Sequence, residues 1–148
     1  MIYLDTSALF KLYLSEDGTS EVQQLIASQS EPISIWELLE AELLNTFKLK
    51  VFWGEITDAE SSGLERQLET HKQQGIFHRT SIDWQYLMNT FIRLTASTTD
   101  IGCRAMDIFH VAFALQIGAS SFASFDRRQR ALAEKEGLKL FPDNDPKA

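Results

Sequence analysis

Residues 2–7 of the chain read IYLDTS, which is three apolar residues followed by an aspartate and two hydroxyl side chains. We expect the apolar residues to form a short buried strand, and Thr6-Ser7 to cap the helix that follows. Residues 122–126, FASFD, also form a mostly apolar run that ends in an aspartate. Asp5 and Asp126 then lie at the carboxyl ends of two strands, which is where open parallel sheets place their ligand sites.

Strand-like and helix-like segments alternate along the rest of the chain. We expect strands at residues 2–4, 33–35, 76–82, 122–125 and 138–141, and helices at 6–13, 21–27, 36–52, 83–94, 104–117 and 127–136, with a further helix from 57 through 68 and a polar loop at 98–100. This alternation predicts an α/β fold, a three-layer α/β/α sandwich with a mainly parallel central sheet. We expect a single domain over residues 1–148, ending in a flexible tail at 142–148.

The composition narrows the class of protein. The chain has 148 residues, 44% of them hydrophobic, so it can bury a core, and no apolar run is long enough to span a membrane. We expect no signal peptide, and the single cysteine, Cys103, fits a reducing cytoplasm and is expected to pack rather than to act as a nucleophile. The net charge of −7 argues against non-specific binding of nucleic acid but is compatible with a metal site or a basic protein partner.

Four carboxylates are candidates for one shared site: Asp5, Glu42, Asp107 and Asp126. Asp107 lies in a segment that is apolar nearly all round, so its carboxylate needs a partner when the helix is buried. Converging carboxylates repel one another, and a hard divalent cation relieves that repulsion. Oxygen ligands suit Mg²⁺ or Mn²⁺, which activates a water and stabilises charge on a phosphate. The pattern therefore predicts a metal-dependent enzyme.

Each acid also has a structural alternative. Asp5 and Asp126 can be helix N-caps, a role that leaves one carboxylate oxygen for other work. Asp107 can pair with Arg104, three residues earlier. His110, three residues after Asp107, is expected to be a hydrogen-bonded structural side chain rather than a metal ligand. The sequence alone leaves these alternatives open.

The second acid is contested between Glu40 and Glu42, which lie on one predicted helix. Glu40 projects near the main apolar stripe of that helix, so helical periodicity alone selects Glu40. Glu42 projects toward a second side of the helix, together with Asn45.

Four stretches together resemble the PIN domain, the family that includes the VapC toxins of bacterial toxin–antitoxin pairs. They are residues 2–9 (IYLDTSAL) with Lys11-Leu12-Tyr13, residues 42–47 (ELLNTF), residues 102–112 (GCRAMDIFHVA) and residues 122–129 (FASFDRRQ). The four motifs occur in the family's order, and the resemblance spans nearly the whole chain. Residues 54–97 match little of the pattern, so substrate preference does not follow from the resemblance.

The resemblance implies a metal-dependent ribonuclease that uses Mg²⁺, or Mn²⁺, and acts as the toxin of a type II toxin–antitoxin pair. It implies that the catalytic residues and metal ligands are Asp5, Glu42, Asp107 and Asp126, with support from Thr6, Ser7, Asn45 and Arg104. It selects Glu42 over Glu40 because Asn45 follows Glu42 by three residues. The implied partners are RNA, a small antitoxin-like protein and a second copy of the chain, without a membrane.

Two other functions stay open. Asp5 could be the covalent nucleophile of a phosphotransferase, although such enzymes commonly carry a second acid at the position that Ser7 occupies. The fold could instead serve as a non-catalytic interaction module. Candidate bases for holding phosphates are Lys11, Arg104, Arg127, Arg128 and Arg130. Candidate apolar residues for a protein interface are Trp36, Phe47, Val51, Phe52 and Trp53, and the alternative for each of them is an ordinary core position.

Overall fold

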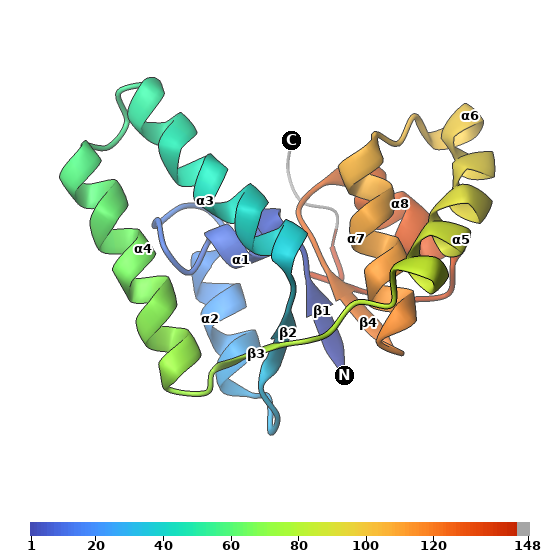
Figure 1. Ribbon diagram of the computed structural model, residues 1–148, viewed down its shortest axis with the longest axis horizontal. Helices are drawn as coiled ribbons and strands as arrows, with labels where there is room; N and C mark the ends of the chain where they lie inside the picture. The colour runs from blue at the N-terminus through green and yellow to red at the C-terminus, as the bar shows by residue number, and fades with distance from the viewer. Residues whose placement is uncertain (145–148) are drawn as a thin grey trace. The chain divides into compact units, whose positions relative to one another are not determined.

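The computed structural model describes residues 1–144 and divides into two compact units. Unit 1 comprises residues 1–8 and the chain from Ser81 onward, and unit 2 comprises Leu9–Thr80. In chain order (Figure 1) the elements are β1 (Ile2–Leu4), α1 (Thr6–Phe10), α2 (Thr19–Ala27), β2 (Ile33–Ile35), α3 (Glu37–Phe52), α4 (Asp58–Gln73), β3 (Phe77–Arg79), α5 (Trp84–Leu94), the 3₁₀ helix η1 (Thr95–Ser97), α6 (Thr98–Ile101), α7 (Ala105–Gln116), β4 (Ser121–Ala123), α8 (Arg127–Lys135) and β5 (Lys139–Phe141).

Unit 1 is built on a three-stranded parallel sheet in the order β1-β4-β5. Leu4 at the end of β1 pairs with Ala123 at the end of β4, so both strands end at the same edge of the sheet. The Asp5 N–H donates to the Ala123 carbonyl at 3.0 Å and continues this pairing by one residue. The register therefore brings Asp5 and the segment after Ala123 to one edge, as the sequence predicted.

The core of unit 1 lies between this sheet and α7. All residues of β1 are buried, and α7 is buried along most of its length, which agrees with its apolar sequence. The Tyr3 ring lies 5.7 Å from the Phe113 ring and 5.5 Å from the Phe122 ring. Aromatic pairs at such distances add about 0.5–1.5 kcal/mol beyond the burial of their area. Around this core, α5 packs against α7, and α7 packs against α8.

Unit 2 contains a two-stranded parallel sheet of β2 and β3, in which Ile33 pairs with Phe77. The connection between the two strands contains α3 and α4, which lie side by side as a helical hairpin (Figure 1). Thr57 begins α4 with the predicted capping box, because its hydroxyl accepts the Glu60 N–H while the Glu60 carboxylate accepts the Thr57 N–H.

The core of unit 2 includes Trp36 and Phe47, whose side chains are both 0% exposed. The Phe47 ring packs against Tyr13 at 5.6 Å between centroids. Both residues were candidates for a protein interface with an ordinary core position as the alternative, and the core position is confirmed for both. Phe52 and Trp53, at the end of α3, are 82% and 56% exposed and stay available for such an interface.

Several segments differ from the sequence-based expectation. The strand expected at 76–82 is only Phe77–Arg79, because its partner β2 ends at Ile35 and the ladder ends there with it. Residues 98–100 belong to helix α6 rather than to a loop. Gly102 closes that helical turn in the left-handed region at φ +76°, and its N–H donates to the Thr98 carbonyl.

The first helix is also shorter than expected, since α1 ends at Phe10. The chain then turns around Lys11, whose ammonium donates to the Glu16 carboxylate at 2.9 Å and to the Asp17 carbonyl at 2.5 Å. Lys11 is only 8% exposed. It was a candidate base for holding phosphates, and that expectation is wrong because the ammonium is buried and engaged in this turn.

The C-terminal segment contacts α8 as far as the structure describes it. Arg130 donates from Nη2 to the Pro142 carbonyl at 2.8 Å and to the Asn144 carbonyl at 3.4 Å. Residues 145–148, the rest of the expected flexible tail, lie outside the described residues. Over residues 1–144, no helix has the length and apolarity needed to cross a membrane.

The carboxylate of Glu40 forms ion pairs within unit 2. Its Oε1 accepts the Lys72 ammonium at 2.7 Å, and its Oε2 accepts Arg79, so one carboxylate joins α3 to α4 and to β3. Burial raises the pKa of Glu40, but the hydrogen bonds from Lys72 and Arg79 outweigh burial and hold the pKa below its usual value. The inward position of Glu40, which periodicity detected, is therefore explained by an ion-pair cluster.

We predict that Glu40→Gln lowers the free energy of unfolding by about 1–3 kcal/mol at pH 7, because the substitution removes hydrogen bonds to a charged group. Since the folded-state pKa of Glu40 is depressed, its contribution is present above the unfolded pKa and is lost as the pH falls through the folded value. Urea unfolding of both proteins at pH 7 and at acid pH tests this.

The matched control is Glu65→Gln, which removes one partner of the exposed Lys48–Glu65 pair and should change stability by less than about 1 kcal/mol. A stability difference between wild type and Glu40→Gln that is the same at both pH values would contradict the role given to the Glu40 charge.

Candidate active site

Asp5 lies between β1 and α1, and both of its carboxylate oxygens are engaged. Oδ1 accepts the Ala8 N–H at 2.9 Å and the Ser7 hydroxyl at 2.7 Å, while Oδ2 accepts the Ser124 hydroxyl at 2.6 Å. The bond from Ala8 is an N-cap bond to the third residue of the helix. Asp5 is therefore the cap of α1, and the expectation that Thr6 or Ser7 caps this helix is wrong.

The Asp5 side chain is fully buried, at 0% exposure. Burial raises the pKa of Asp5, and nearby His110 together with the donors Ser124, Ser7 and Ala8 opposes that rise. A buried carboxylate without an opposing full charge is costly in free energy. A cation placed near Asp5 would offset that cost.

Asp126 is the N-cap of α8, and its Oδ1 accepts the Gln129 N–H at 3.0 Å. The Asp126 N–H donates to the Ser124 hydroxyl at 3.0 Å. Ser124, which is fully buried, thus donates its one proton to Asp5 and accepts from Asp126. Arg130 fixes the same segment by donating to the Ser124 carbonyl at 3.0 Å.

Asp107 is the third residue of α7 and is 8% exposed. Its Oδ2 accepts the backbone N–H of Arg104, the N-cap residue, at 2.8 Å. Its Oδ1 accepts the Gln129 Nε2 at 3.2 Å. Asp107 thus has Arg104 as a partner through the main chain, and the Gln129 side chain ties it to α8.

Three of the four predicted acids therefore belong to one hydrogen-bonded series in unit 1. This acid network consists of Asp5, Ser124, Asp126, Gln129 and Asp107 in order of contact. Each of its acids lies in the first turn or at the cap of a helix, namely α1, α8 and α7. A helix N-terminus favours negative charge by about 0.3–1 kcal/mol at exposed positions. The fold thus brings three carboxylates into one network and supplies each with backbone donors.

His110 is fully buried next to this network. The Tyr3 hydroxyl lies 2.7 Å from Nδ1, and the Thr6 hydroxyl lies 3.5 Å from Nε2. The prediction of a hydrogen-bonded histidine is confirmed, and His110 is near enough to Asp5 to affect the pKa of that carboxyl.

Cys103 is buried just before α7. Burial raises the pKa of its thiol, and the carboxylates of Asp107 and Asp126 raise it further. A raised pKa suppresses the thiolate, which is the nucleophilic form. The prediction that Cys103 packs rather than reacts is therefore supported, and both acids are close enough to act on the same thiol.

Glu42, the fourth predicted acid, belongs to unit 2 and lies on α3 with its side chain partly buried. Its backbone carbonyl accepts the Thr46 hydroxyl at 2.8 Å. Asn45, one helical turn further, is exposed. The ion pairs with Lys72 and Arg79 explain the burial of Glu40, and Glu42 has interactions of its own.

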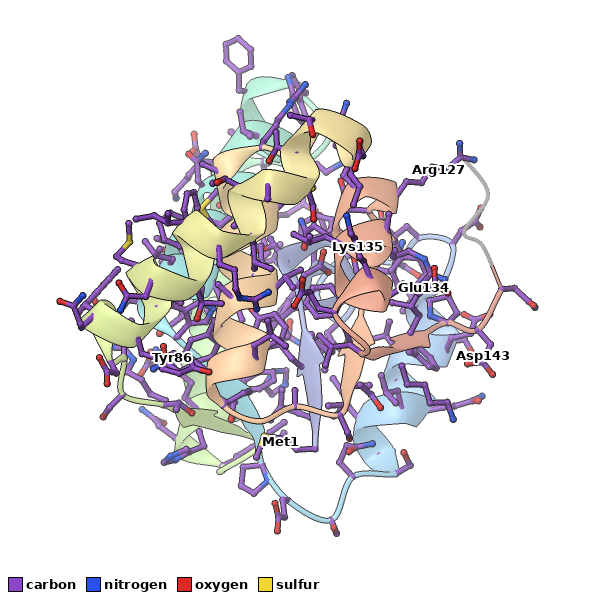
Figure 2. All side chains as sticks on the ribbon, turned by 90° about the vertical axis from the view of Figure 1, so that its right-hand side faces the viewer. Met1, Tyr86, Arg127, Glu134, Lys135 and Asp143 are labelled. Carbon is purple, nitrogen blue, oxygen red and sulfur yellow. The ribbon has the colours of Figure 1, made fainter. Side chains whose placement is uncertain are left out.

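Basic side chains flank two of the acids in unit 1. Arg104 precedes α7 and is exposed. Arg127, which is labelled in Figure 2, and Arg128 occupy the exposed first turn of α8. The first turn of a helix disfavours cations, so these two arginines are not placed there for the stability of α8. Arg130 is 4% exposed and donates to backbone carbonyls, so the expectation that it holds phosphates is wrong.

The donor set fits a hydrated divalent cation. Within residues 1–144, no three His, Cys, Asp or Glu side chains form a cluster that could hold a metal ion by themselves. Mg²⁺ seldom needs such a cage, because it usually keeps several waters and binds one or two carboxylates plus substrate phosphates. Each carboxylate oxygen has two lone pairs, and Asp107 uses one on each oxygen. The acids can thus keep their donors and still ligate a cation.

Ser124 and Gln129 are members of the acid network that the sequence did not single out. Ser124 precedes Asp126 by two residues, and its partner Asp5 is 119 residues away in the chain. Gln129 follows Asp126 by three residues, the spacing of an N-cap bond, and that spacing is the only sequence signal for it.

Comparison with known proteins gives one family match. The PIN domain model matches residues 2–135, which is nearly the whole chain. No curated protein sequence matches the chain. The family match, together with the parallel strands, confirms the predicted α/β/α fold class.

Three solved structures have a similar fold. FitAcB from Neisseria gonorrhoeae has a TM-score of 0.69 at 18% identity, covering 97% of this chain and 98% of that chain. VapC20 from Mycobacterium tuberculosis, described as a sarcin-ricin loop cleaving toxin, has a TM-score of 0.66 at 13% identity, covering 88% and 94%. PAE2754 from Pyrobaculum aerophilum has a TM-score of 0.59 at 15% identity, covering 94% and 82%. At these identities the structures show the fold alone, and with the family match they lead to one conclusion: the chain belongs to the PIN domain family.

Proposed function

We propose that this protein is a metal-dependent endoribonuclease that hydrolyses RNA phosphodiester bonds and acts in the cytoplasm as the toxin of a type II toxin–antitoxin pair. The observation that carries the proposal is the acid network, in which Asp5, Asp126 and Asp107 are joined through Ser124 and Gln129. Membership of the PIN domain family supports a nuclease. The toxin role is supported by the similar folds of VapC20 and FitAcB.

The residues that would hold the cation are Asp5, Glu42, Asp107 and Asp126, which are also the proposed catalytic residues. The preferred ion is Mg²⁺, with Mn²⁺ as a substitute, because the donors are carboxylate oxygens. When bound, such an ion supplies an activated water and stabilises charge that develops on the phosphate.

The remaining residues of the site orient these ligands. Ser7 donates to Asp5 and accepts the Phe125 N–H at 2.9 Å, so it fixes Asp5 relative to the segment after β4. Thr6 contacts His110, which in turn lies near Asp5. Asn45 is proposed to act with Glu42, from which it is three residues away on α3.

Substrate binding has to overcome the net charge of −7. Arg104, Arg127 and Arg128 are exposed at the N-termini of α7 and α8, the helices that carry Asp107 and Asp126. We propose that these arginines and the backbone donors of the two helix ends hold RNA phosphates. Local positive charge beside the acids thus allows an acidic chain to bind RNA at one place.

The burial of Asp5 argues against the phosphotransferase alternative. Its side chain is 0% exposed, Oδ1 accepts two hydrogen bonds and Oδ2 accepts a third. A covalent nucleophile needs an oxygen that reaches the phosphorus atom, and Oδ1 already uses both lone pairs on the Ser7 and Ala8 donors. If the protein is a non-catalytic module, the wild type will cleave no RNA in the assay described below.

We further propose two protein partners, a second copy of the chain and a small antitoxin-like protein. The acidic charge of the chain favours a partner that presents a cationic side chain, such as an arginine that pairs with the carboxylates and blocks the site. Phe52 and Trp53 are the exposed residues of the predicted apolar interface set. Interface cores are enriched in such aromatic residues.

We predict that Asp5→Asn lowers Mg²⁺- or Mn²⁺-dependent RNA cleavage by more than about 100-fold, beyond the 10–100-fold loss usual for residues that only support a ligand. Without metal, the same variant should stay folded, because asparagine keeps nearly the same shape and its amide oxygen still accepts the Ala8 N–H and the Ser7 hydroxyl. Cleavage of an RNA substrate and thermal melting in chelator are the two measurements.

Glu42→Gln should be inactive as well, whereas Glu40→Gln is the matched control on the same helix and should cleave normally below its melting temperature. Full activity of purified Asp5→Asn, or of the wild type in excess chelator, would show that the mechanism is wrong. Inactivity of the wild type in every divalent metal would favour the non-catalytic module.

For the partners, we predict that the chain purified from its native host is a dimer that carries a small basic or amphipathic protein. Affinity capture followed by sedimentation measures both properties. Phe52→Ser combined with Trp53→Ser should weaken at least one of these associations without unfolding the chain, since both side chains are exposed. A monomer without a small companion would contradict the toxin role and leave the nuclease proposal in place.

A further inference from the structure

Gln129 has a buried side chain with one engaged end and one unengaged end. Gln129 is 7% exposed, and its Nε2 donates to Asp107 Oδ1 at 3.2 Å. The other end of the same amide, Oε1, is buried and accepts no hydrogen bond from the described residues. A buried acceptor left unsatisfied is destabilising, so it calls for an explanation in a native structure.

The orientation of this amide is fixed by the chemistry of its neighbour. A carboxylate only accepts hydrogen bonds, so Nε2 must face Asp107, and exchanging the two ends would set oxygen against oxygen. The Gln129 backbone N–H also donates to the carboxylate of Asp126, the N-cap of α8. The orphan oxygen therefore belongs to the residue that contacts both of these acids.

The missing donor must suit the oxygen of a side chain whose Nε2 contacts Asp107 and whose backbone N–H contacts Asp126. A neutral donor would satisfy Oε1 but would leave the negative charge of Asp107 and Asp126 unopposed. A hydrated divalent cation supplies both a donor and an opposing charge, because its waters donate strongly and its positive charge offsets the carboxylates. Outer partners of this kind are a regular part of metal sites.

We propose that Gln129 is a positioning residue of the metal site, whose amide N–H holds Asp107 and whose Oε1 accepts a hydrogen bond from the hydration shell of a divalent cation bound at Asp107 and Asp126. This inference rests on the proposed function, since it requires a cation at those acids. The alternative is that Gln129 only ties α8 to α7, in which case its replacement changes stability and not metal affinity.

The test is titration of the RNA-free protein with Mn²⁺, followed by calorimetry or by the electron paramagnetic resonance of the free ion. Gln129→Met keeps the approximate shape of the side chain and removes both the amide N–H donors and the amide oxygen. It leaves the hydrogen bond from the residue 129 backbone N–H to Asp126 unchanged. We expect its Mn²⁺ affinity to fall about 10–100-fold. An affinity within about twofold of the wild type overturns the proposal.

Thr98→Val is the matched control in the same unit, because the Thr98 hydroxyl is also buried without a hydrogen-bond partner among the described residues. Thr98 lies on α6, and its side chain makes no hydrogen bond to the acid network among the described residues. Its replacement by valine should leave the Mn²⁺ affinity unchanged. A loss equal to that of Gln129→Met would mean that any change to a buried polar group in unit 1 weakens the site, which overturns the specific role of Gln129.

Gln129→Glu gives a second readout that does not depend on the methionine variant folding. It retains an acceptor oxygen but replaces the donor to Asp107 by a like charge. Its melting temperature without metal should fall below that of the wild type, and the rise on adding Mn²⁺ should be larger than in the wild type. A rise equal to that of the wild type overturns the proposal, because it would mean that no cation binds close enough to residue 129 to oppose the added charge.

Different results would overturn the role of Gln129 alone and the proposed metal site as a whole. If the wild type binds Mn²⁺ and Asp107→Asn abolishes binding while Gln129→Met binds normally, only the role of Gln129 is overturned. If the wild type binds no Mn²⁺, both the role of Gln129 and the proposed metal site are overturned.

Discussion

The hydrogen bond from the Ser124 hydroxyl to the Asp5 carboxylate, at 2.6 Å, is the interaction on which the rest of the site depends. A serine hydroxyl has one proton, so donating it to Asp5 leaves its lone pairs to accept the Asp126 N–H. Asp126 then caps α8 in the orientation that lets Gln129 reach Asp107. This series exists because β1 and β4 are parallel neighbours whose ends coincide, with Leu4 opposite Ala123. The pairing of two short strands thus sets the positions of three carboxylates.

Capping and metal binding are compatible uses of the same carboxylates. Asp5 and Asp126 stabilise the starts of α1 and α8, and Asp107 accepts a backbone N–H at the start of α7. Backbone donors and helix dipoles reduce the cost of holding charge there, but they provide no full positive charge. Asp5, fully buried with a raised pKa, and the orphan Oε1 of Gln129 are the places where this arrangement is incomplete. The proposed cation would oppose the negative charge of the acids, and its hydration shell would supply the donor that Gln129 Oε1 lacks.

The parts of the structure that depend on local chemistry were predictable from the sequence. The capping box of Thr57 and Glu60, the buried helix around Asp107 and the strand 33–35 follow from spacing and composition over a few residues. Periodicity also detected that Glu40 is buried, but it could not supply the reason, because Lys72 and Arg79 are 32 and 39 residues away.

What the sequence could not supply depends on distant partners. The end of β3 was set by β2, and the burial of Arg130 was set by carbonyls of Ser124 and the C-terminal segment. Ser124 and Gln129 escaped notice because a serine and a glutamine become informative only once their carboxylate partners are known. The assignment of Glu42 over Glu40 came from the family resemblance and stays a prediction, because the ion pairs of Glu40 explain only the burial of that carboxylate.

The most direct test of the central claim, that the acid network holds a divalent cation, is anomalous diffraction from crystals of the protein soaked in Mn²⁺. The account predicts an anomalous peak at about 2.0–2.2 Å from carboxylate oxygens of Asp107 and Asp126, the distance range of small hard cations. The same map shows directly whether Glu42 supplies a ligand. A fully occupied Mn²⁺ peak elsewhere, with none beside Asp107 and Asp126, would contradict the account.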